Sequence, residues 1–306
     1  MAKKGLETLP YYDEAAIAGV LEWPVLIDTI ERAMISFSAG EVVQPVRQML
    51  PVPGRDAFIG AMPAIGDAMA VKVVTLYHGN AGTDIPTHQA TILVFDKDNG
   101  SPVAVLDGRL ITEMRTAAGS AAAARKLAIP NPEAVTIMGS GVQARAHAAA
   151  LATVRSLGEL RLWARTETSG RAAAEDIGAI FVANAESAVR DADIVVCATS
   201  ATEPVLMGDW LKPGAFVASV GWNGRDGREL DDTAMANTVV VESYDAARDQ
   251  AGNVRGSACE IFAEVGEVFA GTKTVPEGAT VIYDSVGIAI EDAAAAGLAC
   301  DLLADR

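Results

Sequence analysis

Four charged side chains stand in apolar or glycine- and proline-rich surroundings, where burying a charge is expensive unless it is paired. Arg47 follows QPV, Lys72 lies within AVKVVTL, Arg115 begins RTAAGSAAAARK, and Glu260 lies within GSACEIFAEVGEVF. Three cations and one anion can together hold a small carboxylate whose amino or imino nitrogen faces Glu260. We take Lys72, Arg115 and Glu260 as candidate catalytic residues and Arg47 as a further substrate contact. The alternative for each residue singly is an ordinary interdomain salt bridge.

A glycine-rich turn is the second chemical signal. The stretch VTIMGSGVQARAHAAAL contains G-x-G-x-x-A, formed by Gly139, Gly141 and Ala144, after an apolar strand and at the start of a helix. The first glycine permits a tight turn, the second lets the backbone approach a pyrophosphate, and the alanine allows close helix–strand packing. The alternative is a glycine turn in some other α/β fold. The motif predicts a dinucleotide site formed by Gly139, Ser140, Gly141, Val142 and Gln143.

The strand that follows bears on the choice of nicotinamide cofactor. An NAD site usually ends this strand with an acidic residue that binds the ribose hydroxyls. Here the strand LRLW is followed by Ala164, Arg165 and Thr166, while Glu159 lies at its other end. A guanidinium and a hydroxyl suit a 2′-phosphate, which a carboxylate would repel. We therefore expect NADPH/NADP⁺ rather than NADH; the alternative is that Arg165 is merely solvated.

The elements expected around these residues form two domains. Residues 13–40 are predicted to be helical and residues 42–107 to form short strands, which is an α+β pattern. From residue 109 onward, helices alternate with near-continuous apolar strands, which is typical of a parallel, doubly wound sheet covered on both faces. We expect an α/β protein with a Rossmann-type domain over residues 115–287. The first domain, residues 1–114, is completed by a returning C-terminal helix within 288–306.

Composition excludes several classes of protein. The chain of 306 residues has a formal net charge of −16, so a general nucleic-acid or anionic-membrane binder is not expected. Because the three histidines are scattered and show no H-x-x-x-H spacing, we expect no metal site. The sequence has no apolar run long enough to span a bilayer, no secretory signal pattern, and three dispersed cysteines. These features predict a cytoplasmic protein.

The chain also resembles, nearly end to end, the ornithine cyclodeaminase/mu-crystallin family. The resemblance lies in PTHQATILVFDKDNG, VAVLDGRLITEMRTAAGSAAA, MGSGVQARAH, LWART, ATEPVLMGDWLKPGAFVASVG, RELDD, EIFAEVGEVFAGT and YDSVGIAIEDAAAAGL, in order between residues 86 and 298. It implies an NADP-dependent oxidoreductase acting on C=N bonds, as in the branch that reduces ketimines. It also implies a homodimer whose first domain binds a small carboxylated substrate and forms the subunit interface.

The resemblance assigns further roles to residues. It implies that Arg47, Lys72 and Arg115 hold the substrate carboxylate, with Arg115 also near the cofactor, and that Glu260 lines the substrate pocket. It places Ala164, Arg165 and Thr166 at the cofactor phosphate. His88 is expected to bind the cofactor by hydrogen bonding; a proton-donor role is the alternative. The full set of further cofactor contacts is Thr87, His88, Gln89, Thr199, Val220, Gly221 and Ser285.

One departure from the family pattern bears on the reaction. The cyclodeaminases carry an aspartate shortly after the V-G turn of the fifth strand, and this chain has Asn223 there, in SVGWNGRDGREL. An amide cannot act as a general base at neutral pH, so imine reduction is favoured over cyclodeamination. The alternatives are an ornithine or lysine cyclodeaminase or amino-acid dehydrogenase, with Asp226 replacing the missing acid, and a ligand-binding protein without turnover.

Overall fold

The chain divides into two compact units, which we describe separately. The computed structural model describes residues 9–221, 224 and 226–305. Unit 1 comprises Met1–Arg115 with Ile288–Arg306, and unit 2 comprises Thr116–Gly287. The boundary between Arg115 and Thr116 falls inside the long helix α3, Gly108–Leu127.

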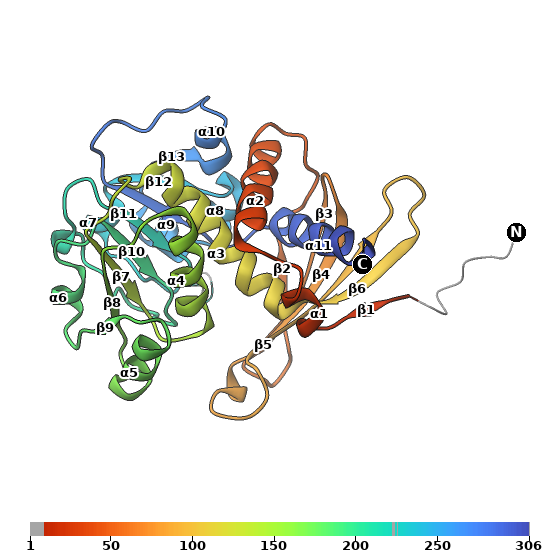
Figure 1. The fold of residues 1–306 in the computed structure, drawn as a ribbon, viewed down its shortest axis with the longest axis horizontal. Coiled ribbons are helices and arrows are strands. Elements are labelled where there is room, and N and C mark those ends of the chain that lie inside the picture. Colours follow the sequence, from red (N-terminus) through yellow and green to blue (C-terminus); the bar gives the residue numbers. More distant parts are fainter. Residues whose placement is uncertain (1–8, 222–223, 225, 306) are drawn as a thin grey trace, which may run out of the picture. The chain divides into compact units, whose positions relative to one another are not determined.

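Unit 1 is a six-stranded sheet with helices packed on it (Figure 1). The strand order is β1-β6-β5-β4-β3-β2, antiparallel except for the parallel pair β1 and β6. The elements are β1 (Tyr11–Tyr12), α1 (Glu14–Ala18), α2 (Trp23–Ser38), β2 (Gln48–Pro51), β3 (Ala57–Ile65), β4 (Met69–Tyr77), the 3₁₀ turn η2 (His78–Asn80), β5 (His88–Phe95), β6 (Pro102–Asp107) and α11 (Ala289–Ala304). Helix α11 packs against β3, β4, β5 and α2, so the end of the sequence returns to unit 1.

Helices α1 and α2 lie where the sequence predicts them, because residues at their ends favour a helix start or a helix end. The Asp13 side chain caps α1 by accepting a hydrogen bond from the N–H of Ala16 at 2.9 Å. Pro24 lies in the first turn of α2, where a missing N–H does no harm. Gly40, at φ +77°, ends that helix. The sequence was less informative on residues 42–52, predicted as a strand: only Gln48–Pro51 is one, because Pro45 interrupts the segment.

The register of the unit 1 sheet places Lys72 on its core face. Successive strand residues point to opposite faces, and Met62, Lys72, Ile92 and Leu106 form one row across β3, β4, β5 and β6. Met62, Ile92 and Leu106 are buried, and Lys72 is only 2% exposed. The register therefore buries one ammonium among apolar neighbours.

Unit 2 is an eight-stranded, all-parallel sheet in the order β13-β12-β14-β11-β10-β7-β8-β9. Its strands are β7 (Ala134–Met138), β8 (Glu159–Trp163), β9 (Ile180–Phe181), β10 (Ile194–Cys197), β11 (Phe216–Ser219), β12 (Thr238–Val241), β13 (Ile261–Glu264) and β14 (Val281–Asp284). Every residue of β7, β10, β11 and β14 is buried, as expected for a sheet covered on both faces. The predicted α/β, doubly wound fold is confirmed; β13 was not predicted.

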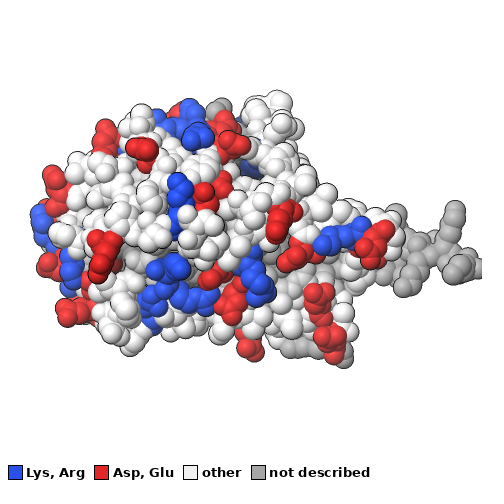
Figure 2. Space-filling view, turned by 90° about the horizontal axis from the view of Figure 1, so that it is seen from above, with Lys and Arg blue, Asp and Glu red and all other residues white. Residues whose placement is uncertain are grey.

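Short helices connect these strands. They are α4 (Val142–Val154), α5 (Glu167–Asp176), α6 (Ala185–Val189), the 3₁₀ turn η3 (Gly208–Trp210), α7 (Asp232–Met235), α8 (Tyr244–Gln250), α9 (Gly252–Ser257) and α10 (Val265–Phe269). Figure 2 shows acidic and basic side chains interspersed over one face of the molecule. Among the described helices, none has the length and apolar character to cross a membrane.

Candidate active site

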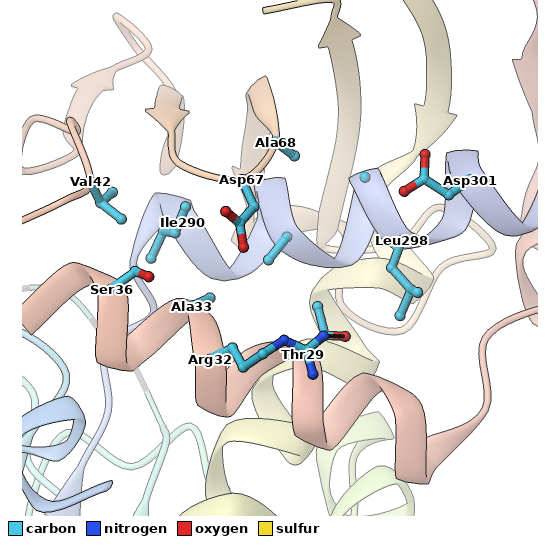
Figure 3. Close-up of a pocket in the computed structure, with 12 residues that line it drawn as sticks. Thr29, Arg32, Ala33, Ser36, Val42, Asp67, Ala68, Ile290, Leu298 and Asp301 are labelled. Atoms are coloured by element: carbon cyan, nitrogen blue, oxygen red, sulfur yellow. Dashed lines mark hydrogen bonds between the residues drawn. The ribbon is translucent and has the colours of Figure 1, made fainter. Parts of the chain in front are cut away.

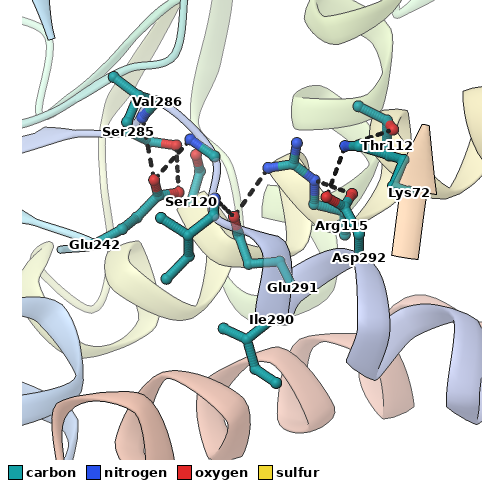
Figure 4. A network of polar contacts seen from close by, with 12 residues as sticks. Lys72, Thr112, Arg115, Ser120, Glu242, Ser285, Val286, Ile290, Glu291 and Asp292 are labelled. Atoms are coloured by element: carbon teal, nitrogen blue, oxygen red, sulfur yellow. Dashed lines mark hydrogen bonds and ion pairs between the residues drawn. The ribbon is translucent and has the colours of Figure 1, made fainter. Parts of the chain in front are cut away.

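A buried ion network in unit 1 joins two of the predicted substrate residues. Lys72 Nζ lies 2.6 Å from Asp292 Oδ2, and Arg115 Nε donates to Asp292 Oδ1 at 3.0 Å. Arg115 Nη1 also donates to Glu291 Oε2 at 2.9 Å. Figure 4 shows the Asp292 carboxylate between the two cations. All four residues are between 1% and 4% exposed, so β4, α3 and α11 together form a buried charge cluster.

The N-terminus of α11 is fastened so that its two acids face these cations. Glu291 Oε2 accepts a hydrogen bond from the N–H of Ile288 at 2.8 Å, which caps the helix. Gln44 Oε1 accepts from the N–H of Ile290 at 2.7 Å. Both contacts satisfy N–H groups that a helix start leaves without intrahelical partners. The position of Asp292 is therefore fixed by the helix start as well as by its ion pairs.

Arg47 and His88 interact electrostatically with this cluster. Burial lowers the pKa of Lys72 to about 8, Asp292 raises it, and Arg115 and Arg47 lower it. Burial also lowers the pKa of His88 to about 4, helped by the charges of Lys72 and Arg115. The imidazole is therefore neutral at pH 7. The charges of Arg47 and Arg115 thus act on Lys72, and a neutral His88 can act as a hydrogen-bonding group beside them.

The PTHQ segment leads into β5, and its strand residues place their side chains on opposite faces of the unit 1 sheet. The carbonyl oxygen of Thr87 accepts from the N–H of Tyr77 at 2.8 Å, and the Thr87 side chain is exposed. His88 and Gln89 are successive strand residues and point to opposite faces. Gln89 lines a hollow on the sheet face opposite α11, together with Val73 and Thr91. Of these residues, His88 is the one coupled to the charge cluster.

The glycine turn in unit 2 has the geometry of a pyrophosphate cradle. Gly139 has φ +128°, and a Cβ there would lie 2.3 Å from the carbonyl oxygen of Ala198. A Cβ on Gly141 would meet nothing within 4 Å, and no side chain caps α4. Gln143 Oε1 is buried and accepts no hydrogen bond from the described residues. The N–H groups at the start of α4, next to the half-exposed Val142, are thus open to an anion, and these residues fit a dinucleotide.

Hydroxyls and one free guanidinium surround the end of β8. Ala164 is 7% exposed, whereas Arg165 and Thr166 are exposed, and Thr166 precedes α5. Ser140 Oγ donates to Ser169 Oγ at 3.1 Å, which joins the glycine turn to the start of α5. The Arg165 guanidinium makes no hydrogen bond or ion pair within the described part of the chain. This region can take a phosphate, and no carboxylate stands in the Asp/Glu position of an NAD site.

Glu229 holds two loops of unit 2 that contain the predicted cofactor residues Thr199 and Gly221. Its Oε1 accepts from the N–H and hydroxyl of Thr199 at 2.7 and 2.6 Å, and its Oε2 accepts from the N–H of Gly221 at 2.8 Å. Ser219 Oγ donates to the same Oε2 at 2.8 Å. Glu229 is 1% exposed, and burial raises its pKa while these hydrogen bonds lower it. Val220 continues the β11 ladder, with its N–H bonded to the carbonyl of Cys197 at 2.9 Å.

Two more buried acids lie at the carboxyl ends of β12 and β14. Glu242 accepts from Ser285 Oγ at 2.5 Å and from the N–H groups of Val286 and Gly287 at 3.1 and 2.7 Å, which holds the turn after β14 (Figure 4). Burial raises the pKa of Asp284 to about 7, with Glu229 and Glu242 contributing. Asn253 Nδ2 donates to Asp284 Oδ1 at 3.0 Å. The predicted residue Ser285 is therefore held in place rather than free.

Three acidic or amide positions remain outside these clusters. Glu260 lies in unit 2, where it is exposed just before β13; its predicted role stays a prediction. Asn223 lies outside the described residues. Asp226 is 92% exposed and its Oδ1 lies 3.5 Å from Arg255 Nη2. The carboxylates that contact Arg115 are Glu291 and Asp292, and Asp292 also contacts Lys72.

Other titratable groups have structural surroundings. His147 is buried, its Nδ1 lies 2.8 Å from the Gln143 carbonyl oxygen, and burial lowers its pKa to about 4. Burial raises the pKa of Cys197, Cys259 and Cys300, so these free thiols stay protonated at neutral pH. A separate hollow of about 240 Å³ lies between α2 and α11 (Figure 3). It contains Arg32 and Asp67 but none of the cluster residues.

Sequence reasoning missed five of these acids and amides: Glu229, Glu242, Asn253, Glu291 and Asp292. A signal for the last two was present, because IAIEDAAAAGL places two charges in an apolar helix, the same pattern that identified Lys72. Glu229 lies in the charge-rich GREL segment, and this local sequence predicts a solvent-exposed side chain. Its burial results from the long-range packing of unit 2.

A parallel sheet with an open glycine turn defines the class: a dinucleotide-binding α/β protein. A model of the ornithine cyclodeaminase/mu-crystallin family matches residues 14–305. The chain therefore belongs to the ornithine cyclodeaminase/mu-crystallin family.

Individual relatives cover nearly the whole chain. The ketimine reductase mu-crystallin of Mus musculus is 42% identical over 286 residues, which are 90% of this chain and 91% of that protein. The structure of Thermococcus litoralis Δ1-pyrroline-2-carboxylate reductase in complex with NADH and L-proline has a TM-score of 0.91 and 32% identity, covering 97% of this chain and 98% of that chain. An archaeal alanine dehydrogenase dimer with bound NAD has a TM-score of 0.90 and 25% identity, covering 97% and 96%.

Proposed function

We propose that this chain is an NADPH-dependent reductase that converts small cyclic imino acids, or ketimines bearing a carboxylate, into amino acids. The observation that carries the proposal is the charge cluster of unit 1. Arg47, Lys72 and Arg115 supply three positive charges, and Glu291 and Asp292 supply two negative ones. The excess of one positive charge matches one substrate carboxylate. The named relatives reduce ketimines or Δ1-pyrroline-2-carboxylate, which supports the same class of substrate.

The chain's residues anchor and orient the substrate. Lys72 uses one N–H on Asp292 and one on Thr112 Oγ1 at 3.3 Å, so its third N–H is left for the substrate carboxylate. Arg115 is held rigid by two carboxylates, so little further ordering is needed on binding. Reduced nicotinamide, when bound, supplies a hydride to the imine carbon. The proton of the iminium nitrogen remains as the N–H of the product, so reduction needs no general base.

The reductive direction is tested against its rivals in one substrate screen. Asn223 stands where cyclodeaminases have an acid, and Asp226 is 92% exposed beside Arg255, which supports reduction over amine deprotonation. We expect NADPH absorbance to fall with pyrroline- and piperideine-2-carboxylates, with the cyclic amino acid as product. Ammonia released from ornithine or lysine would favour a cyclodeaminase. Tight NADPH binding without turnover across the panel would favour a ligand-binding protein.

The preference for NADPH is assigned to Arg165. Replacing Arg165 with alanine is expected to lower kcat/KM for NADPH by roughly 10- to 100-fold, since a hydrogen bond to a charged group contributes about 1.5–3 kcal/mol. The value for NADH should barely change. The matched control is Arg171→Ala, which removes an exposed arginine that pairs with Glu167 on α5. A wild-type enzyme that prefers NADH would overturn the assignment.

We further propose that the chain acts as a cytoplasmic homodimer through the sheet face opposite α11. This face exposes apolar side chains, among them Leu50 at 62%, Ile65 at 45% and Val73 at 42%. Such a patch suits burial against a second copy, and an archaeal relative is described as a dimer. Free thiols suit a reducing compartment. Sedimentation equilibrium should give twice the chain mass, with Val73→Asp shifting it to the monomer; a monomeric wild type would refute the interface.

A further inference from the structure

The carboxylate of Asp292 bridges both cations that we assign to the substrate. It lies 2.6 Å from Lys72 Nζ and 3.0 Å from Arg115 Nε, and all three side chains are nearly inaccessible to solvent. A carboxylate in this place can compete with the substrate for the cations, or it can prepare them. The number of donors decides between these roles, because Lys72 keeps a third N–H even with Asp292 and Thr112 bound.

We propose that Asp292 is a positioning residue that holds Lys72 and Arg115 as a charged pair for the substrate carboxylate and thereby sustains the reaction into the mildly alkaline range. The proposal rests on the function proposed above. Without Asp292, the ammonium of Lys72 would be buried beside like charges with no carboxylate in contact.

The charged groups that act on Lys72 lie on α11, on α3 and in the segment before β2. Asp292 on α11 raises its pKa, whereas Arg115 on α3 and Arg47 before β2 lower it. His88 on β5 is neutral at pH 7 because its own pKa is about 4. Glu291 Oε2 on α11 lies 2.9 Å from Arg115 Nη1. Asp292 is thus the carboxylate in direct contact with Lys72, and its removal favours loss of the Lys72 proton.

The test is the pH profile of kcat/KM for a cyclic imino acid between pH 6 and pH 9.5, roughly the range spanned by these groups. The wild type should lose activity as pH rises through about 8, where Lys72 loses its proton. This fall in kcat/KM is the alkaline limb of the profile. In Asp292→Asn the limb should move to a pH lower by about one unit or more, because an opposite charge nearby shifts a pKa by one to three units. The matched control Glu291→Gln, which removes the carboxylate charge that lies beside Arg115 Nη1, should lower activity without moving the limb. Asp292→Glu retains the negative charge, so its kcat/KM should fall at the same alkaline pH as in the wild type.

A second measurement is independent of turnover. Lysine labelled with ¹³C at Cε can be titrated by NMR, with the Lys72 signal assigned from Lys72→Arg. The Lys72 signal should titrate near pH 8 in the wild type and lower in Asp292→Asn. Unchanged Lys72 titration in the variant would overturn the inference, as would a lower KM with an unmoved limb, which would identify Asp292 as a competitor. If the NMR result holds but no imine is reduced, the proposed function fails instead. If Asp292→Asn does not fold, Asp292→Glu provides the test. A fall in kcat/KM at the same alkaline pH as in the wild type supports the inference, and a fall at a different pH overturns it.

Discussion

Replacing Lys72 with alanine is expected to lower kcat/KM for pyrroline-2-carboxylate by about 100-fold. The lost ammonium would leave the substrate carboxylate without a charged hydrogen bond of about 1.5–3 kcal/mol, and Asp292 would keep only Arg115 as a cationic partner. Steady-state NADPH oxidation measures the effect. An imine that lacks the carboxylate should show almost the same rate with both proteins.

Two controls separate lost anchoring from lost stability. Lys212→Ala removes another lysine that pairs with a buried aspartate, Asp193, but this pair belongs to unit 2. It should lower the free energy of unfolding while leaving kcat/KM near the wild-type value. The double variant Lys72→Ala/Asp292→Ala removes both charges of the pair and should recover part of the stability without recovering activity. Unchanged turnover in a folded Lys72→Ala protein would contradict the anchoring role.

Replacing Glu229 with glutamine is expected to raise the Kd for NADPH by about 10- to 100-fold. Glu229 accepts from two backbone N–H groups, those of Thr199 and Gly221, through different oxygens. A glutamine has one acceptor oxygen, so its NH₂ must face one of these donors, and a buried unsatisfied donor costs about 1–3 kcal/mol. Both loops belong to the predicted cofactor site. Titration of NADPH fluorescence measures the change.

A matched control for Glu229 is Glu186→Gln. Glu186 pairs with Arg190 on the surface of α6, where such a pair contributes about 0–1 kcal/mol. NADPH affinity should be unaffected in that variant. A folded Glu229→Gln protein with wild-type affinity for NADPH would show that the loops do not need this carboxylate.

The sequence predicted what local chemistry determines. The turn at Gly139 and Gly141 is encoded by residue types within a few positions, and the structure gives Gly139 the positive φ that such a turn requires. Lys72 and Arg115 were found because a charge in an apolar segment needs a partner. The same rule indicated Glu260, whose role at the substrate nitrogen stays a prediction. The rule considers each segment alone, so it cannot say which charges meet.

The actual partners of Arg115 lie 176 and 177 positions further along the chain. Only the packing of α11 on the unit 1 sheet brings Glu291 and Asp292 to the cations. Glu229 was missed for a related reason: it follows three charged residues within GRDGREL and has the local pattern of a surface loop. Its burial depends on backbone donors from two other loops. Long-range pairing of this kind is absent from local patterns.

The position of α11 in the sequence has a consequence for biosynthesis. Unit 1 needs residues 288–306, whereas unit 2 is one continuous stretch that is translated earlier. During translation, Lys72 and Arg115 are therefore synthesised before their carboxylate partners, and they lack these partners while residues 116–287 emerge and fold. Assembly of unit 1 closes a loop of more than 150 residues, a high-contact-order step that should be slow and follow unit 2. The newly made chain therefore depends on α11 to complete the charge cluster of unit 1.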